Sequence, residues 1–122
     1  MSKKNLWLCF LSILVIVFGV YIYSVQYVPF LAETEINHMI KTHDVQQFKR
    51  VAANKKTRKF LTSLKTTDKC NYVSDFQGNG DYKNLELYAA QIKNQELEIY
   101  MQKKSLFYWK LRIINFFPKG DN

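Results

Sequence analysis

Residues 108–117 read YWKLRIINFF and form an apolar segment close to the end of the chain. Chain ends fray unless contacts tie them to the rest of the structure. Successive residues of an extended strand point to opposite faces, which places Lys110 and Arg112 on a polar face. The opposite, inner face carries Phe107, Trp109, Leu111 and Ile113. We therefore expect a core strand over residues 106–117 whose inner face needs an apolar cover.

Three earlier stretches show the same two-residue period, which is typical of strands. They are residues 71–77, 85–90 and 96–102. In the second stretch Leu85, Leu87 and Ala89 are expected to share the core face. The segments GNGD (78–81), KNQ (93–95) and KKS (103–105) separate the stretches as turn signals. The pattern predicts an antiparallel meander.

Helical periodicity precedes the strands. Apolar residues recur at helical spacing in residues 30–43, 44–52 and 55–64. Asp44 is an acceptable N-cap for the second of these segments. The three segments are the only cover available for the inner face of the sheet, so we expect them to pack on that face.

The first quarter of the chain contains an uncharged run, LWLCFLSILVIVFGVYIYSV, at residues 6–25. Roughly 20 apolar residues in a helix cross about 30 Å of hydrocarbon, and Pro29 is expected to close this helix. The residues expected in the membrane include Leu6, Trp7, Ile13, Val17, Ile22 and Val25. The predicted fold class is therefore α+β: an N-terminal transmembrane helix, then two to three helices packed on a curved antiparallel sheet of about four strands.

Two other interpretations of the uncharged run stay open. A cleaved signal peptide also begins with basic residues, but this run is long for one and no A-x-A site follows it. A buried core helix needs a larger domain to enclose it. Because Lys3 and Lys4 precede the run and the next basic residue is Lys41, the positive-inside rule places the N-terminus in the cytoplasm. Residues 1–28 are then the cytoplasmic N-terminus and a single-pass helix of the cell (inner) membrane, and residues 29–122 form an extracytoplasmic domain.

The expected outer domain is basic. After residue 28 lie 16 basic and 10 acidic residues, a net charge of +6, which favours anionic surfaces. The basic residues of the two short helical segments are Lys49, Arg50, Lys55, Lys56, Arg58 and Lys59. Anionic lipid beside the membrane or an acidic protein is the partner that this run favours, and a solvated helix face is the alternative. Nucleic acid is not expected, because the run lacks interleaved stacking aromatics.

The outer face of the predicted sheet is not fully polar. Its aromatic and apolar residues are Tyr88, Tyr100, Tyr108, Ile114 and Phe116. Helices on one side of the sheet would leave these side chains in water, which predicts a surface for a second copy of the chain or for an envelope protein. Scattered surface aromatics are the alternative, because single aromatic residues are normal on strands.

The order of elements resembles the cone-shaped α+β fold of the cystatin-like and nuclear-transport-factor-two-like superfamily. Many membrane-anchored bacterial members end in a strand similar to Trp109-Lys110-Leu111 with apolar residues after it. The chain is also similar to a bacterial family of unknown function with one spanning helix. The residues that carry this second likeness are Ile36, Ile40, His43, Asp44, Val45, Phe48 and, after the W-K-L ending, Pro118. The resemblance implies a ligand-sized cone or an assembly surface and no single activity.

Few residues favour catalysis. His38 and His43 are five apart, whereas a helical metal pair needs a spacing of four. Asp75 and Asp81 flank a glycine turn. We expect no enzyme, metal or cofactor, because no catalytic motif with a definable mechanism is found. Cys70 is interpreted as a small buried residue, with an intermolecular disulfide as the alternative.

Two functional classes stay open at this point. One is a non-catalytic assembly or protein-interaction module of the bacterial envelope, held by its spanning helix. The other is a membrane-anchored cone that binds a small molecule or a lipid. A cone filled by its own side chains favours the first class, and an open apolar pocket favours the second.

Overall fold

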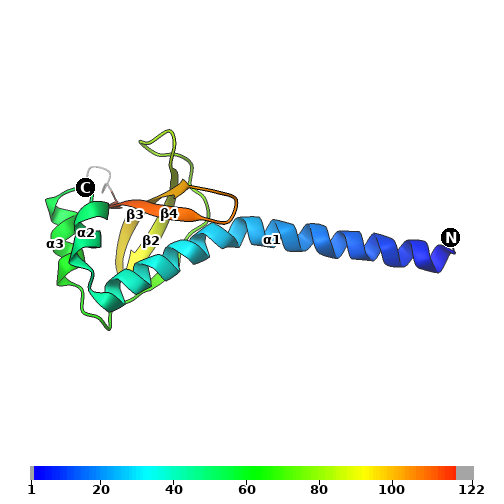
Figure 1. The fold of residues 1–122 in the computed structure, drawn as a ribbon, viewed down its shortest axis with the longest axis horizontal. Coiled ribbons are helices and arrows are strands. Elements are labelled where there is room, and N and C mark those ends of the chain that lie inside the picture. The colour runs from blue at the N-terminus through cyan, green and yellow to red at the C-terminus, as the bar shows by residue number, and fades with distance from the viewer. Residues whose placement is uncertain (1, 118–122) are drawn as a thin grey trace.

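The computed structural model describes residues 2–117, so Pro118, part of the family resemblance, lies outside the described residues. The elements are α1 (Lys3–Thr42), α2 (Val45–Val51), α3 (Lys55–Ser63), β1 (Cys70–Val73), β2 (Glu86–Ile92), β3 (Gln95–Lys103) and β4 (Trp109–Phe116). The strands form one antiparallel sheet in the order β1-β2-β3-β4. Helices α1, α2 and α3 pack on one side of it (Figure 1). The predicted α+β class and four-stranded meander are confirmed.

Helix α1 is longer than the sequence predicts. It runs without interruption for 40 residues and contains Pro29, so the expected break between a spanning helix and a helix over residues 30–43 is wrong. A proline inside a helix removes the hydrogen bond to the carbonyl four residues earlier, here that of Val25, and bends the helix. Figure 1 shows α1 changing direction between its two halves. The helix continues past Pro29 because Ala32 and Ile36 are fully buried against the sheet.

The caps of the short helices follow from local sequence. Asp44 caps α2 as predicted, because its Oδ1 accepts a hydrogen bond from the Gln47 N–H at 3.2 Å. Asn54, which separates α2 from α3, accepts a bond from the Thr57 N–H at 2.9 Å in the same way. Each cap satisfies an N–H group that would otherwise have no partner at the start of a helix.

The core lies between the second half of α1, the two short helices and the inner face of the sheet. Its fully buried side chains include Ile36, Met39 and Ile40 of α1, Phe48 of α2, Leu61 of α3, and Leu97, Ile99, Met101, Leu111 and Ile114 of the sheet. Residues 32, 36, 39 and 40 of α1 follow the spacing of one helix face. The two-residue period expected over residues 96–102 is confirmed, because Leu97, Ile99 and Met101 are all buried on the core face of β3.

Strand β4 contains a bulge. Its register against β3 shifts between the pairs Met101↔Leu111 and Tyr100↔Ile113, which leaves Arg112 as the extra residue. A bulge puts two residues of one strand opposite one residue of its partner. The alternation of faces is therefore reversed after Arg112.

The bulge corrects the predicted core face of the last strand. Leu111, which precedes it, and Ile114, which follows it, are both buried in the core. Ile113, expected inside, lies half-buried on the outer face. Phe107, also expected inside, is 63% exposed, because β4 begins two residues later.

Strand β2 presents the opposite face from the one predicted. Its buried residues are Tyr88, Ala90 and Ile92 rather than Leu87 and Ala89. The turn at Lys93 and Asn94, with φ of 49° and 63°, sets this register. Two left-handed residues in a hairpin turn match the twist of the flanking strands. The turn pairs Ala90 with Leu97, so the two side chains share the core face.

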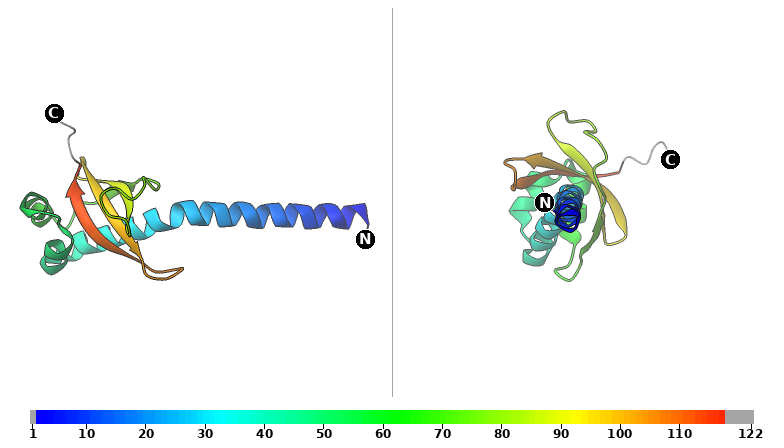
Figure 2. Two further views of the ribbon diagram at one scale, coloured as in Figure 1. Left: turned by 90° about the horizontal axis from the view of Figure 1, so that it is seen from above. Right: turned by 90° about the vertical axis from the view of Figure 1, so that its right-hand side faces the viewer.

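Two polar residues of α1 cover the two edges of the sheet. Glu35 Oε2 accepts a hydrogen bond from the Leu111 N–H of β4 at 3.2 Å. Asn37 Oδ1 accepts one from the Cys70 N–H of β1 at 2.7 Å, and its Nδ2 donates to the Cys70 carbonyl at 3.4 Å. Edge strands otherwise leave such backbone groups unpaired. The right-hand view in Figure 2, along α1, shows the curved sheet lying beside this helix.

The loop between β1 and β2 covers part of the outer face of the sheet. The Tyr82 ring packs edge-to-face on the Tyr100 ring, with centroids 4.7 Å apart. Gly80 has a φ of 58°, and a Cβ at this position would clash with the Tyr100 hydroxyl. Only glycine meets both requirements without strain. Tyr100 is consequently 2% exposed.

Candidate functional site

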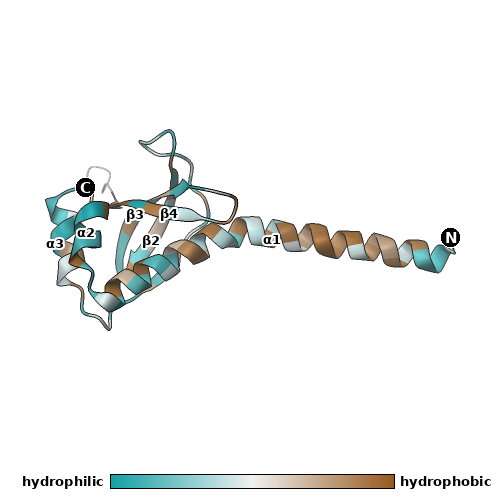
Figure 3. Ribbon diagram, viewed as in Figure 1, coloured by the Kyte–Doolittle hydropathy of each residue, from teal (hydrophilic) through white to brown (hydrophobic). Residues whose placement is uncertain are grey.

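The first half of α1 stands outside the folded domain. All residues from 2 to 24 are exposed, with Val15 at 70%. Figure 3 shows mostly apolar residues, coloured brown, along the ribbon of this half. Among the described residues α1 is the one helix long and apolar enough to cross a membrane, by length and composition. The six residues expected in the membrane, Leu6, Trp7, Ile13, Val17, Ile22 and Val25, all lie in this half of α1.

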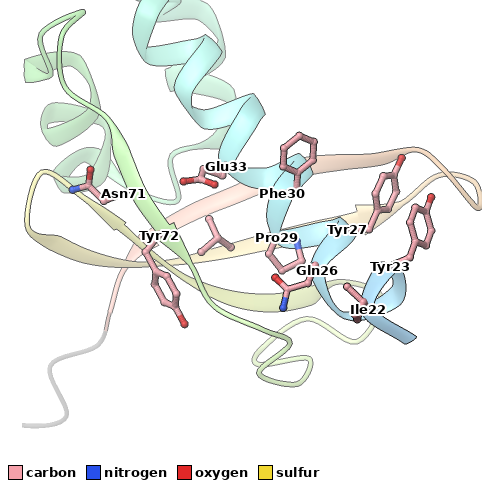
Figure 4. A pocket seen from close by; sticks show the side chains of 10 residues that line it. Ile22, Tyr23, Gln26, Tyr27, Pro29, Phe30, Glu33, Asn71 and Tyr72 are labelled. Carbon is pink, nitrogen blue, oxygen red and sulfur yellow. The ribbon is translucent and has the colours of Figure 1, made fainter. Parts of the chain in front are cut away.

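A surface groove of about 490 Å³ separates α1 from β1 where the exposed half of α1 meets the domain. Figure 4 shows the side chains that line it. Its apolar and aromatic lining includes Ile22, Tyr23, Tyr27, Pro29, Phe30 and Tyr72. The groove is therefore mostly apolar and lies at the junction between the two halves of α1.

On the same junction, α1 contacts the hairpin between β3 and β4. The Tyr23 and Tyr27 rings stack with centroids 4.6 Å apart, and Figure 4 shows them side by side. The Tyr27 hydroxyl donates a hydrogen bond to the Phe107 carbonyl, and the Phe107 ring lies edge-on to Tyr23 at 6.5 Å. Sequence reasoning missed this contact because it joins residues 80 positions apart. The available signal was three large apolar residues, 106–108, directly after a turn.

The six basic residues expected to bind an anionic surface gather on α2 and α3. They are Lys49, Arg50, Lys55, Lys56, Arg58 and Lys59, and all are exposed. Within residues 2–117 the structure has one ion pair, between Lys93 and Asp68 at 3.9 Å, and it includes none of these six. Both views show α2 and α3 at the end of the domain farthest from the exposed half of α1 (Figures 1 and 2). The basic residues therefore do not lie beside the apolar segment, contrary to expectation.

Glu35 forms a polar site between α2 and β4. Its Oε1 accepts a hydrogen bond from Gln47 Nε2 at 3.2 Å, in addition to the bond from Leu111. Glu35 and Gln47 line a second surface groove, distinct from the apolar one, and Arg50, Lys110 and Arg112 also line it. Burial raises the pKa of the Glu35 carboxyl, although its two hydrogen bonds and nearby Lys110 act in the opposite direction. The site therefore joins α1, α2 and β4 and has a structural role in the domain.

The exposed face expected from five residues of the sheet is not formed. Tyr88 and Ile114 are 4% and 0% exposed and belong to the core, because the β2 register and the β4 bulge turn them inward. Phe116 is half-buried against Phe60, with ring centroids 5.4 Å apart. The loop described above covers Tyr100. Only Tyr108, at 58%, is exposed as expected.

The other candidate residues considered from the sequence are Cys70, His38 and His43. Burial raises the pKa of the Cys70 thiol to about 11, and the side chain is 2% exposed, in agreement with its interpretation as a small buried residue. His38 and His43 are exposed. No group of three or more His, Cys, Asp or Glu residues that could hold a metal occurs among residues 2–117.

Comparison with known proteins gives no matching family model, no matching curated protein and no matching solved structure. Neither a family nor a relative therefore assigns a role to any residue named above. Function has to be argued from the geometry and chemistry of this chain's own residues.

Proposed function

We propose that this chain is a single-pass membrane protein whose α+β domain is a non-catalytic interaction module on the outer side of the cell membrane. One observation carries the proposal: α1 is a single helix whose first half is exposed and apolar, while its second half is part of the core. Residues 6–25 supply the roughly 20 residues that a membrane crossing needs. Lys3 and Lys4 favour a cytoplasmic N-terminus.

The filled core favours an interaction module over a cone that encloses a ligand. A protein that binds a small molecule inside keeps a cavity for it. Here Ile36 and Met39 of α1 and Ile99 of β3, each fully buried, occupy the space between helix and sheet. Membership of the cystatin-like superfamily is part of the same proposal, with the cone filled by the chain's own side chains.

The basic end of the domain is the surface we assign to the partner. Exposed basic side chains without ion-pair partners attract an acidic surface. Because α2 and α3 lie away from the exposed half of α1, they would face a partner in the envelope rather than the bilayer that holds the helix. A second copy of the chain meeting the same end would bring like charges together, which disfavours a homo-oligomer through this surface.

A crosslinking pull-down of the full chain from membranes tests the proposal. Two matched triple variants should be compared: Lys55→Gln, Arg58→Gln and Lys59→Gln on α3, and Lys41→Gln, Lys83→Gln and Lys93→Gln elsewhere. The first variant should lose an acidic protein that the parent and the second variant retain. Recovery of the same proteins from all three forms, or of none, would show that the basic end does not bind a partner.

A second candidate function is lipid binding, which the apolar groove between α1 and β1 favours. The groove opens beside the half of α1 that we place in the membrane, so an acyl chain has a short path into it. Mass spectrometry of lipids released from the purified chain tests this function. Tyr72→Ser should reduce a bound lipid to background, and an unchanged lipid content would remove the groove from consideration.

A further inference from the structure

The tip of the β3–β4 hairpin carries three consecutive large apolar side chains in water. Leu106, Phe107 and Tyr108 are 67%, 63% and 58% exposed. The turn is closed by hydrogen bonds from the Lys104 and Ser105 N–H groups to the Tyr108 carbonyl, at 2.9 and 3.0 Å. Hairpin turns are normally built from polar residues, glycine and proline. A closed turn that holds apolar residues outward points to a surface that those residues contact.

The position of the tip relative to α1 identifies that surface. Phe107 accepts the Tyr27 hydrogen bond and lies against Tyr23, and these two tyrosines flank Val25, the last residue of the uncharged run. With a rise of 1.5 Å per residue, a helix that crosses the hydrocarbon with residues 6–25 places Tyr23 and Tyr27 at the head-group level. The hairpin tip is therefore at the same level.

The composition of the tip fits the membrane interface. Aromatic rings and the ends of lysine side chains favour the head-group region, where the ring is partly apolar and the ammonium group meets lipid phosphate. Lys103 and Lys104 precede the three apolar residues and are exposed. Figure 1 shows the hairpin reaching toward the exposed half of α1, on the side of the domain opposite to α3.

We propose that Leu106, Phe107 and Tyr108 insert into the head-group region of the leaflet from which α1 emerges. The inference rests on the membrane crossing by α1 proposed above. One helix alone leaves a domain free to rotate about the helix axis. The hairpin tip supplies a second lipid contact, and it is bonded to α1 through Tyr27, 80 residues before Phe107 in the sequence. The two contacts together fix the rotation of the domain. They also direct the basic residues of α2 and α3 away from the membrane.

Collision measurements on nitroxide labels in the full chain test this contact. The chain carries Cys9→Ser, retains the buried Cys70, and is placed in nanodiscs of phosphatidylethanolamine and phosphatidylglycerol. The label is attached at Leu106→Cys and, in matched controls, at Ile16→Cys in the exposed half of α1 and at Ser63→Cys at the end of α3. Thermal melting of each labelled form confirms that the domain is folded.

We expect the ratio of oxygen to nickel-chelate collisions at position 106 to exceed that at position 63 several-fold and to stay below that at position 16, because the head-group level lies between water and the hydrocarbon centre. If position 16 has a lipid-like ratio and position 106 matches position 63, the hairpin contact is wrong and the membrane crossing stands. If position 106 is protected from both reagents, a protein surface covers the tip and the lipid contact is wrong. A water-like ratio at position 16 overturns both the crossing and the hairpin contact.

Discussion

The two halves of α1 have the same secondary structure and opposite surroundings. Residues 6–25 are apolar on every side and project from the domain, whereas residues 28–40 are apolar along one face and buried along it. The content of apolar residues therefore does not decide which half enters the domain. The arrangement of those residues around the helix decides it, because a one-sided stripe leaves polar positions free to bond with the sheet.

The polar side chains show the same difference. In the first half, Ser12 Oγ donates to the Leu8 carbonyl at 3.0 Å and Ser24 Oγ to the Tyr21 carbonyl at 2.8 Å, so both stay within the helix. In the second half, Glu35 and Asn37 bond to the two edges of the sheet. Polar groups in hydrocarbon must find partners within the helix itself, whereas polar groups in the domain can organise strands.

The largest difference should come from one isoleucine in each half. Ile36→Ala empties a fully buried position and should lower the free energy of unfolding of the domain by roughly 2–5 kcal/mol. Ile16→Ala, at a position that is 64% exposed, should leave that free energy unchanged. Denaturant unfolding in detergent, followed by the fluorescence of Trp109 in a Trp7→Phe background, measures both. Equal effects of the two substitutions would contradict the division of α1.

Removing the hydrogen bonds of Glu35 and Asn37 to the edges of the sheet should have a smaller effect on the free energy of unfolding. Glu35→Ala leaves the Leu111 N–H of β4 without its partner, and Asn37→Ala does the same to the Cys70 N–H of β1. Each substitution should cost about 1–3 kcal/mol, the range for an unsatisfied buried donor. Ser12→Ala and Ser24→Ala are the matched changes in the first half and should not move the unfolding midpoint. If the serine substitutions lowered the unfolding midpoint and the Glu35 and Asn37 substitutions did not, the proposed difference between the two halves of α1 would be wrong.

The contribution of Glu35 to the stability of the domain should also depend on pH. Burial raises the pKa of this carboxyl in the folded state, so the folded chain keeps the proton to a higher pH than the unfolded chain does. The resulting stabilisation is complete below the unfolded pKa of about 4.3 and is lost as the pH rises through the folded pKa. The stability advantage of the parent over Glu35→Gln should therefore shrink with rising pH. An advantage that grows would mean that the hydrogen bonds favour the ionised form.

The two cysteines give the smallest effect, a difference in labelling. Burial and a pKa of about 11 keep the Cys70 thiol protonated and inaccessible at neutral pH. Cys9 lies on the exposed first half of α1, only three residues after the start of the uncharged run at Leu6, so in vesicles a small membrane-permeant maleimide should label Cys9 faster than Cys70. Denaturant should make both residues react. Labelling of Cys70 as fast as Cys9 in the folded chain would show that β1 is not held as the Asn37 contact requires.

Features encoded by local sequence could be predicted. The uncharged run, the Asp44 cap and the two-residue period of β3 each depend on neighbouring residues, and the structure contains all three. The continuity of α1 through Pro29 could not be predicted, because local geometry favours a break there. Packing of Ala32 and Ile36 on the sheet offsets the lost hydrogen bond, and such packing is a long-range property.

The candidate site was less accessible to sequence reasoning for the same physical reason. A single extra residue at Arg112 exchanges the faces of Ile113 and Ile114, and no local signal marks it. The contact between Tyr27 and Phe107 depends on where the hairpin meets α1, which follows only from the completed fold. The basic run was recognised, but its position at the far end of the domain depends on how α2 and α3 pack.

The intact mass of the chain recovered from the membrane fraction tests most directly whether α1 anchors the domain. We predict that the chain stays in the membrane after alkaline carbonate extraction and retains the whole of α1, with a mass near the 14.5 kDa of the full sequence. A soluble product that begins near residue 28 would contradict this account. It would mean that the first half of α1 is a cleaved signal peptide and that the hairpin tip has no bilayer beside it.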